Sequence, residues 1–379
     1  MKLLYLTSPS FFDLEISLIR ELSKRNEVKV LMIIMPTSQH SSAFSIDDLP
    51  QGVRIENFKN IPELKKYDNL IDRNIWFLAS RENNSFYMNL RLSFLIKKFI
   101  SDFRPDLIHL TSVAKNALTL LPILRQYNKI LTVHDPIPHS KLSFFKNISR
   151  NIILKFFKNI IFLSHSCDEE FTQNYGYLGC KIFYSRLGIY EFLNSYSENC
   201  IHIDNYILFF GRIDQYKGVD ILVEAFRQSN LSKKGVKLVI AGSGKEQKFN
   251  SITNTDNIIL MNRYIHNHEL ASLIRNALFT VLPYRTATQS GCLFSSFAFD
   301  KPVVATTVGD LAIEVKDGKT GILVKPSNIT SLAEGLCRMY SADLQNMRTN
   351  IHQLYAEEGE YSWSRIANGL IDIYKQIIK

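Results

Sequence analysis

Residues 207–226 read ILFFGRIDQYKGVDILVEAF, which places an apolar run, a glycine and a helical pattern in direct succession. Ile207–Phe210 predicts a buried strand, and Gly211 allows a sharp turn after it. The apolar residues that follow recur with helical spacing: Val219, Leu222, Val223 and Phe226. A loop between such a strand and helix lies at the carboxyl edge of a parallel sheet, where open α/β sheets bind ligands.

This loop carries two cations, Arg212 and Lys217. Arginine presents a planar fork to phosphate oxygens, and lysine presents a mobile point charge. Hydrogen bonds to charged groups of this kind contribute roughly 1.5–3 kcal/mol each. The loop therefore predicts a diphosphate clamp, with two solvated loop cations as the alternative reading of the residue types.

The same segment resembles the GR–x–KG segment of retaining glycosyltransferases of the two-Rossmann-domain (GT-B) type, in family 4, and the likeness continues along most of the chain. In that family the matching arginine and lysine bind the donor's diphosphate. The resemblance implies an α/β fold of two Rossmann-like domains facing across a cleft, with a C-terminal helix crossing back to the N-terminal domain. The expected parts are an acceptor-binding domain (1–195), a nucleotide-sugar-binding domain (205–364) and a terminal helix (365–379), with a linker over Ser195–Asn205.

Length and composition fit this reading. A chain of 379 residues can hold two domains, each with its own core. The net charge of +9 favours an anionic partner. A nucleic-acid binder is disfavoured because the basic residues lack an aromatic RNA or DNA motif, and an NAD enzyme because no G-x-G-x-x-G follows the first strand.

The expected compartment is the cytoplasm, at the inner face of the membrane if the chain docks there. The N-terminus does not read as a signal peptide, and no apolar run reaches the ~18–20 residues of a spanning helix. The cysteines are odd in number and form no CxxC pair, which favours reduced thiols. They are Cys167, Cys180, Cys200, Cys292 and Cys337.

Three histidines of the first domain have different expected roles. His134 follows the strand Lys129–Val133, and the resemblance implies that it contacts the donor sugar near its reacting carbon. A turn residue bonded to Asp135 is the alternative. His109 lies inside the strand Leu107–Leu110 and is expected to be a core or loop-edge residue, and His139 is expected to shape only the acceptor side.

Residues 141–158, KLSFFKNISRNIILKFFK, predict a basic amphipathic helix. Its stripe consists of Phe145, Ile148, Ile152 and Phe156, and no acidic residue interrupts the segment. Such a helix can lie in an anionic membrane interface. The alternative is an ordinary packed helix whose basic side faces water.

In the second domain, a Gly-x-Gly turn at Gly242 and the segment Arg263–Ile265 follow predicted strands. The stretch 283–309, PYRTATQSGCLFSSFAFDKPVVATTVG, resembles a branch of family 4 met in polysaccharide assembly, and its serine, glycine and helix-opening amides suit phosphate. The donor contacts implied by the resemblance are Gly211, Arg212, Lys217, Gly242, Arg263, Tyr264, Ile265, Thr286, Gln289, Ser290, Gly291 and Ser295.

Two glutamates that typical members place in this stretch are missing. Thr286 or Ala287 stands at the first position and Ser295 at the second. A serine hydroxyl binds a ribose hydroxyl more weakly than a carboxylate does. The sequence therefore leaves the donor sugar and the base open.

The expected reaction is transfer of a hexose from a UDP- or GDP-sugar to a hydroxyl of a glycan or lipid-linked acceptor, with retention. His134, Arg212 and Lys217 are the expected catalytic residues. No metal and no bound cofactor are expected, because the cations can neutralise the leaving diphosphate. The alternatives are a catalytically impaired partner of another transferase and a nucleotide-sugar epimerase of the same fold.

Overall fold

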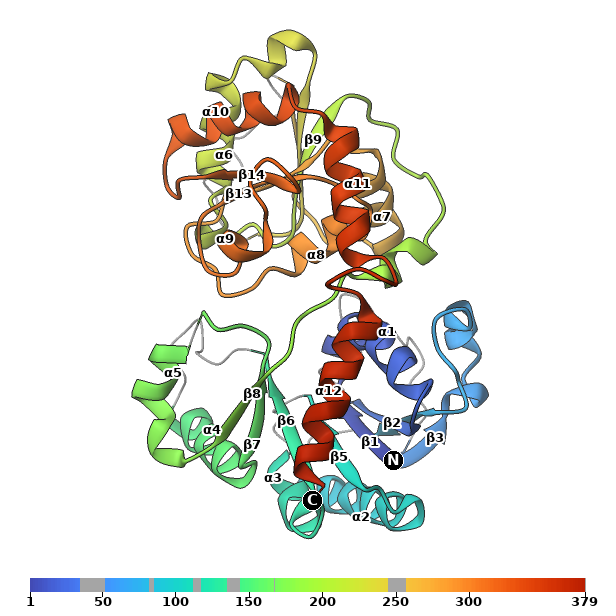
Figure 1. The fold of residues 1–379 in the computed structure, drawn as a ribbon. Coiled ribbons are helices and arrows are strands. Elements are labelled where there is room, and N and C mark those ends of the chain that lie inside the picture. The colour runs from blue at the N-terminus through green and yellow to red at the C-terminus, as the bar shows by residue number, and fades with distance from the viewer. Residues whose placement is uncertain are drawn as a thin grey trace. The chain divides into compact units, whose positions relative to one another are not determined.

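The computed structural model describes residues 1–34, 52–81, 85–111, 117–134, 144–166, 168–244 and 257–378. It divides into two compact units. Unit 1 comprises Met1–Leu187 and the segment from Trp363 onward, and unit 2 comprises Gly188–Ser362. Each unit is built on its own sheet flanked by helices (Figure 1). The predicted α/β fold with two Rossmann-like units is confirmed.

The sheet of unit 1 has the strand order β3-β4-β2-β1-β5-β6-β7-β8. The strands are β1 (Lys2–Thr7), β2 (Glu27–Ile34), β3 (Arg54–Asn57), β4 (Trp76–Ser80), β5 (Leu107–Leu110), β6 (Lys129–Val133), β7 (Asn159–Phe162) and β8 (Lys181–Tyr184). Neighbouring strands are parallel except β3 and β4, which are antiparallel. The central strands are almost continuously apolar, as expected where both faces of a sheet are covered.

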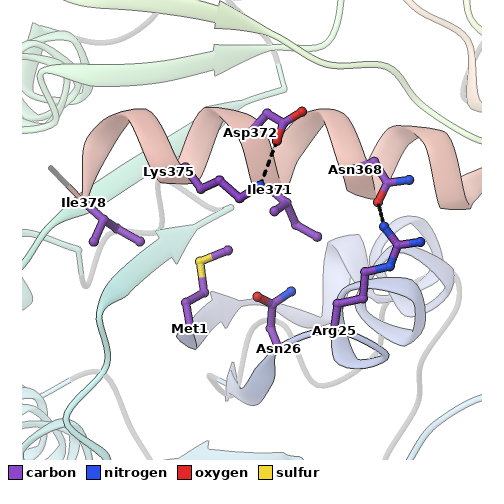
Figure 2. A pocket seen from close by; sticks show the side chains of 8 residues that line it. All are labelled: Met1, Arg25, Asn26, Asn368, Ile371, Asp372, Lys375 and Ile378. Atoms are coloured by element: carbon purple, nitrogen blue, oxygen red, sulfur yellow. Dashed lines mark hydrogen bonds and ion pairs between the residues drawn. The ribbon is translucent and has the colours of Figure 1, made fainter.

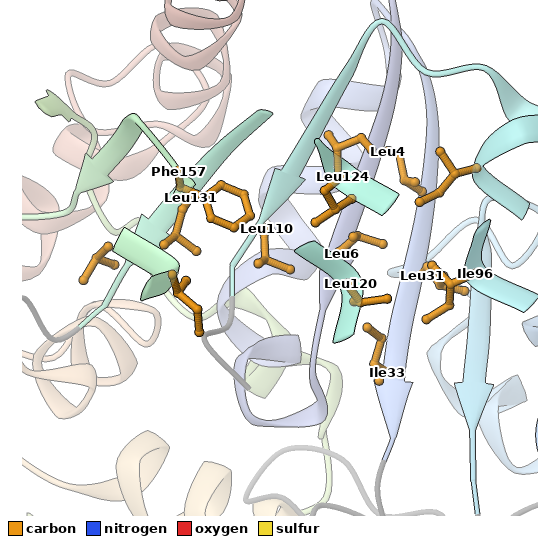
Figure 3. Packing of buried hydrophobic residues seen from close by; sticks show 14 of the residues in the cluster. Leu4, Leu6, Leu31, Ile33, Ile96, Leu110, Leu120, Leu124, Leu131 and Phe157 are labelled. Carbon is orange, nitrogen blue, oxygen red and sulfur yellow. The ribbon is translucent and has the colours of Figure 1, made fainter. Parts of the chain in front are cut away.

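One face of this sheet is covered by a layer of helices: α2 (Phe86–Phe103), α3 (Ala117–Leu124), α4 (Phe144–Phe156) and α5 (Asp168–Tyr175). Their inward side chains interlock with the strands in one apolar cluster. Figure 3 shows Ile96 of α2 and Leu120 and Leu124 of α3 packed against Leu4, Leu6 and Leu31. Helix α1 (Phe12–Ser23) packs against the C-terminal helix α12 (Trp363–Ile377).

Helix α12 belongs to unit 1 although it follows unit 2 in sequence. It buries Ile366, Leu370 and Tyr374. Tyr374 Oη lies 2.6 Å from Nδ1 of His109, whose Nε2 lies 2.7 Å from Thr132 Oγ1. Because His109 is buried and bonded at both nitrogens, its assignment as a core histidine is confirmed, and so is the return of the C-terminal helix to the first domain.

The sheet of unit 2 has the order β11-β10-β9-β12-β13-β14, and all of its pairs are parallel. Its strands are β9 (Tyr206–Phe210), β10 (Lys237–Ala241), β11 (Ile258–Met261), β12 (Thr280–Leu282), β13 (Val303–Thr306) and β14 (Gly321–Val324). Its helices are α6 (Val219–Gln228), α7 (Asn267–Asn276), α8 (Gly291–Phe297), α9 (Leu311–Glu314), α10 (Ile329–Tyr340) and α11 (Leu344–Tyr355).

The boundary between the units differs from the predicted 1–195 and 205–364. Residues 188–205 already pack on unit 2, because their backbone and amides find partners there. Tyr190 N donates to Phe294 O at 3.3 Å, and Asn194 Nδ2 donates to Ala298 O at 2.9 Å. The second crossing lies between Ser362 and Trp363, two residues before the predicted start of the terminal helix.

Helix α4 falls within the segment 141–158, of which residues 141–143 lie outside the described residues. Its core contacts come from Ile153 and Leu154, with Phe157 just beyond its end, whereas Ile148 and Ile152 of the predicted stripe are exposed. The helix is therefore amphipathic with part of its apolar surface in solvent. No helix in the described ranges has the length and apolarity needed to cross a bilayer.

Candidate functional site

The loop between β9 and α6 is held at the carboxyl edge of the unit 2 sheet by close backbone approach. Gly218 has φ 68°, and a Cβ at this position would lie 2.0 Å from Pro283 O. A Cβ at Gly242, after β10, would lie 1.9 Å from Gly211 O. Only glycine fits both contacts. The turns after β9, β10 and β12 therefore converge, as the sequence predicted for a ligand-binding edge.

Lys217 is the most enclosed cation of this loop. It is only 8% exposed, and its Nζ donates a 2.6 Å hydrogen bond to Tyr284 Oη. The ammonium lies 3.8 Å from the ring centroid of Tyr284 and 5.2 Å from that of Tyr216. The rings of Tyr216 and Tyr284 and the hydroxyl group of Tyr284 therefore fix the position of the ammonium.

Tyr284 connects this lysine to the start of α8. Its hydroxyl lies 3.1 Å from Ser290 Oγ, and both residues are buried. Burial raises the pKa of Tyr284 well above its usual value, so the phenol stays protonated. The phenol accepts from Lys217 and shares a second hydrogen bond with Ser290, in which either hydroxyl can be the donor.

Arg212 presents the opposite situation. Its side chain is exposed and has no hydrogen-bond or ion-pair partner among the described residues. An unengaged guanidinium on the same short loop as Lys217 is available to an anion from solvent. The structure thus carries both predicted clamp cations on one loop, one enclosed and one open.

An ion pair that the sequence analysis missed fastens this loop. Arg285 makes two bonds to Asp220, with Nη1–Oδ1 at 2.9 Å and Nη2–Oδ2 at 2.6 Å, and its backbone N–H donates to Tyr216 O at 2.8 Å. The hydrogen bond from Arg285 lowers the pKa of Asp220. Arg285, which follows β12, therefore holds both the start of α6 and the β9–α6 loop that carries Arg212 and Lys217.

The predicted base-contacting segment follows β11. Arg263 is paired with Glu269, with Nη1–Oε2 at 2.8 Å, and this bond lowers the pKa of Glu269 to about 2. Tyr264 is exposed, and Ile265 is half-buried. The ring of Tyr264 is thus accessible for stacking, while the guanidinium of Arg263 is already occupied by Glu269.

The residues predicted before and within α8 fall into two groups. Thr286 is exposed and Gln289 half-buried, whereas Ser290 and Ser295 are buried. A Cβ at Gly291 would lie 2.9 Å from Tyr190 Oη, so this tyrosine lies against the first turn of α8. Tyr190 had no sequence signal of its own, because it lies in the segment read as the end of the first domain.

In unit 1, His134 follows β6 and stacks on Phe11, with ring centroids 3.9 Å apart and planes inclined by 8°. Its Nε2 is buried and has no hydrogen-bond partner among the described residues. Burial lowers the pKa of His134 to about 4, although a hydrogen bond with the backbone of Thr111 acts in the opposite direction. His134 is thus a neutral imidazole in the folded chain. Asp135 and His139 lie outside the described residues.

Comparison with known proteins identifies the family of the chain. The family described as Glycosyltransferase Family 4 matches residues 16–189, and the family described as Glycosyl transferases group 1 matches residues 204–342. Together these matches take in most of both units. The chain belongs to the group 1 glycosyltransferases.

Individual relatives share less than a third of their aligned residues with this chain. An uncharacterized glycosyltransferase of Methanocaldococcus jannaschii is 29% identical over 182 residues, which are 46% of this chain and 48% of the relative. A D-inositol 3-phosphate glycosyltransferase of Paenarthrobacter aurescens is 29% identical over 182 residues, 46% of this chain and 44% of the relative. The chain thus spans about half the length of these relatives.

Solved structures share the GT-B fold of this chain. The Anabaena protein HepE, solved in complex with UDP, is 15% identical and matches with a TM-score of 0.66 over 99% of this chain and all of the other. The sucrose-phosphate synthase of Thermosynechococcus elongatus is 15% identical, with a TM-score of 0.65 over 99% and 98% of the two chains. At this identity the likeness establishes the fold alone.

Unit 1 also has cavities. One of about 750 Å³ lies between Met1, the end of α1 and α12, where Arg25 bonds Asn368 and Lys375 pairs with Asp372 at 3.1 Å (Figure 2). No predicted site residue lines it. A space of about 30 Å³ adjoins His134 and the buried Glu15, whose carboxylate accepts from Thr7. Glu15 is a polar neighbour of the candidate histidine that the sequence did not single out.

Proposed function

We propose that this glycosyltransferase moves a hexose from a UDP- or GDP-sugar to a hydroxyl of a glycan or lipid-linked acceptor, with retention, in the assembly of surface polysaccharide. The observation that carries the proposal is the pair of cations on the β9–α6 loop. Lys217 is fixed between Tyr216 and Tyr284, and Arg212 is open to solvent. The UDP bound in the structurally similar HepE supports a nucleotide donor.

The clamp acts on the leaving group. As the bond from the anomeric carbon to the diphosphate oxygen breaks, its electron pair remains on that oxygen. Arg212 and Lys217 stabilise this charge, and backbone amides near Ser290 and Gly291 add to it. The acceptor oxygen forms the new bond, and its proton passes to the leaving phosphate. Neutralisation by two side-chain cations makes a divalent ion unnecessary, so activity is expected to survive EDTA.

His134 supplies the remaining polar contact to the sugar. Its neutral ring offers the unsatisfied Nε2 to a sugar hydroxyl or to the developing charge, depending on the tautomer. Base contacts are assigned to Tyr264 and Ile265, and contacts to phosphate and sugar to Gln289 and Ser290.

The deciding experiment measures nucleotide release in the presence of acceptor. Arg212→Ala and Lys217→Ala are each expected to lower turnover about 10- to 150-fold, which corresponds to one charge-assisted bond. Lys233, an exposed lysine of unit 2, provides the matched control Lys233→Ala with unchanged turnover. If both clamp variants turned over donor like the control, the proposal would be wrong.

A second candidate is a partner protein that binds nucleotide-sugar and assists another transferase. Two observations favour it: Thr286 or Ala287 and Ser295 stand where the resemblance implies carboxylates, and Ser295 is only 5% exposed. Under this alternative the chain binds UDP- or GDP-sugar, seen as a rise in melting temperature, without turning it over. An epimerase would instead convert the donor when no acceptor is present.

The predicted place of work is the cytoplasm, at the inner face of the membrane. The free thiols of Cys180, Cys200, Cys292 and Cys337 support a reducing compartment. Membrane contact through 141–158 is part of the proposal, because Ile148 and Ile152 of α4 remain exposed.

A further inference from the structure

Helix α2 exposes large apolar side chains over its first half. Phe86 is 73% exposed, Tyr87 69%, Leu90 49% and Phe94 68%. Phe86, Leu90 and Phe94 are four residues apart and form one stripe along the helix. The stripe is separate from the core contact of α2, which is made by Leu92, Ser93, Ile96, Ile100 and Phe103.

Contacts at both ends of α2 and along its buried face hold the helix in place. Ser85 caps α2 by accepting from Met88 N at 3.2 Å, and the helix ends at Arg104, which has φ 53° and precedes Pro105. The cap and the buried face fix the rotation of the helix about its axis. The aromatic side chains therefore point away from the sheet because the other side of the helix is anchored.

Basic residues share the exposed side of α2. Arg91, Lys97 and Lys98 are exposed, and none has an ion-pair partner among the described residues. At 100° per residue, Lys97 follows the line of Phe86 and Leu90, while Lys98 lies near Tyr87. Aromatic residues occupy the first half of the exposed face and lysines the second.

Helix α4 extends this surface. Helix α3 packs against both α2 and α4, so the three helices form one layer on the sheet (Figure 1). On the side away from the core, α4 exposes Ile148, Ile152 and Lys155. The three helices together contain Arg91, Lys97, Lys98, Lys146, Arg150 and Lys155 but a single acidic residue, Asp102.

We propose that the docking face, defined as Phe86, Tyr87, Leu90, Phe94, Lys97 and Lys98 of α2 with Ile148 and Ile152 of α4, binds the surface of an anionic lipid bilayer. Exposed aromatic rings enter the headgroup region, and lysines attract anionic headgroups. A second copy of the chain is a poorer occupant, because two such basic faces repel each other and the centre of a protein interface is depleted in charge.

This inference goes beyond the predicted segment 141–158 by placing the main apolar contact on α2. It does not depend on the donor clamp, because vesicle binding and glycosyl transfer are measured separately. A chain that docks but transfers no sugar would contradict only the transfer reaction. A chain that transfers sugar without docking would contradict this inference and the membrane contact through 141–158, but not the transfer reaction.

The test is co-sedimentation of the full chain with vesicles of phosphatidylcholine alone and with vesicles of phosphatidylcholine and phosphatidylglycerol in a roughly 2:1 ratio. We expect binding to the anionic vesicles that weakens at high salt. The double variant Phe86→Ser/Phe94→Ser should lower partitioning at least about tenfold, since two aromatic side chains leave the interface. Lys97→Gln/Lys98→Gln should lower it about fivefold per charge, and only on anionic vesicles.

Matched controls come from unit 2. Ile313 is 54% exposed, and Lys233 and Lys319 are exposed. Ile313→Ser and Lys233→Gln/Lys319→Gln should bind vesicles like the unchanged chain, and all variants should keep its melting temperature.

Three results would overturn the inference. One is an unchanged chain that stays in the supernatant with anionic vesicles. Another is a loss of binding that the unit 2 controls share. The third is that Phe86→Ser/Phe94→Ser still binds vesicles but sediments as a smaller species than the unchanged chain. That result would identify a second copy of the chain as the occupant of the docking face.

Discussion

Lys217 Nζ and Tyr284 Oη are 2.6 Å apart, in a hydrogen bond that joins the loop after β9 to the segment after β12. The ammonium is also held against the face of the same ring. A phenol that accepts from lysine does not cancel its charge, unlike a carboxylate. An ammonium held at the carboxyl edge of the sheet by a neutral partner is what the proposed diphosphate clamp requires.

Tyr284→Phe tests this positioning. The substitution keeps the ring under Lys217 but removes the acceptor, leaving a largely buried ammonium with one fewer bond, so we expect stability to fall by about 1–3 kcal/mol. The KM for donor should rise while the charge itself remains, so the loss of turnover should be smaller than for Lys217→Ala. Urea unfolding and steady-state kinetics measure the two effects. Equal turnover losses in both variants would show that the phenol itself contacts the donor.

Arg285→Ala tests the ion pair with Asp220, which joins the segment after β12 to the start of α6. The pair is partly exposed, at 27% and 55%, so its contribution is at most about 1 kcal/mol, and we expect the melting temperature to change little. The KM for donor should rise up to about fivefold because the clamp loop loses a fixed connection. Arg227→Ala is the matched control, since Arg227 pairs with Glu224 at 2.8 Å on the same helix. A similar KM in both variants would assign Arg285 no role in positioning the loop.

Part of this site could be read from the sequence, and part could not. The glycine-flanked loop with Arg212 and Lys217 was predictable because strand, turn and helix signals are local. The partners of Lys217 and Asp220 were not, because Tyr284 and Arg285 are more than 60 residues away in sequence and only strand order brings them near. Local signals carry no information on which loops share an edge.

The same distinction applies to the fold. Apolar runs predicted strands of both sheets, among them Lys129–Val133 and Ile207–Phe210. Strands β3 and β4 were missed, because the stretch 40–80 reads as polar and irregular and is broken by Pro50, Gly52 and Pro62.

The sequence of Met88–Phe103 predicts a basic helix, and α2 begins two residues earlier, at Phe86. Its exposed Phe86 and Phe94 and its buried Leu92 and Ile96 are equally apolar, so the sequence could not tell which face meets the core.

The two histidines of unit 1 predict a pH dependence of stability. Burial lowers the pKa of His109 to about 3 and that of His134 to about 4, below the ordinary 6.5. The unfolded chain then binds more protons than the folded chain below pH 6.5, so stability present above that value is lost as the pH falls toward 4 and 3. For the fully enclosed His109 the loss at pH 5 is about 2 kcal/mol.

Proton NMR of the ring Cε1–H groups provides the check. The signals of His109 and His134 should stay constant between pH 8 and 5.5, while histidines on the surface shift in this range. Assignment uses His109→Gln and His134→Gln. A titration of either ring near pH 6.5 would contradict its placement in the interior.

Gly218→Ala tests how closely the clamp loop approaches the segment after β12. Two costs are expected: the left-handed backbone at φ 68°, about 1–2 kcal/mol, and the approach of the new Cβ to Pro283 O at 2.0 Å, which forces the loop to move. Gly318 separates them, because it has φ 73° and no atom lies within 4 Å of the place that a Cβ would take there. Gly318→Ala should therefore show the backbone cost alone, with donor KM unchanged.

Gly218→Ala should be less stable by a further ~1–3 kcal/mol and should bind donor more weakly, because Arg212 and Lys217 move with their loop. Thermal unfolding and donor titration of the two variants measure the difference, and equal values for both would mean that the loop can relax without disturbing the cations.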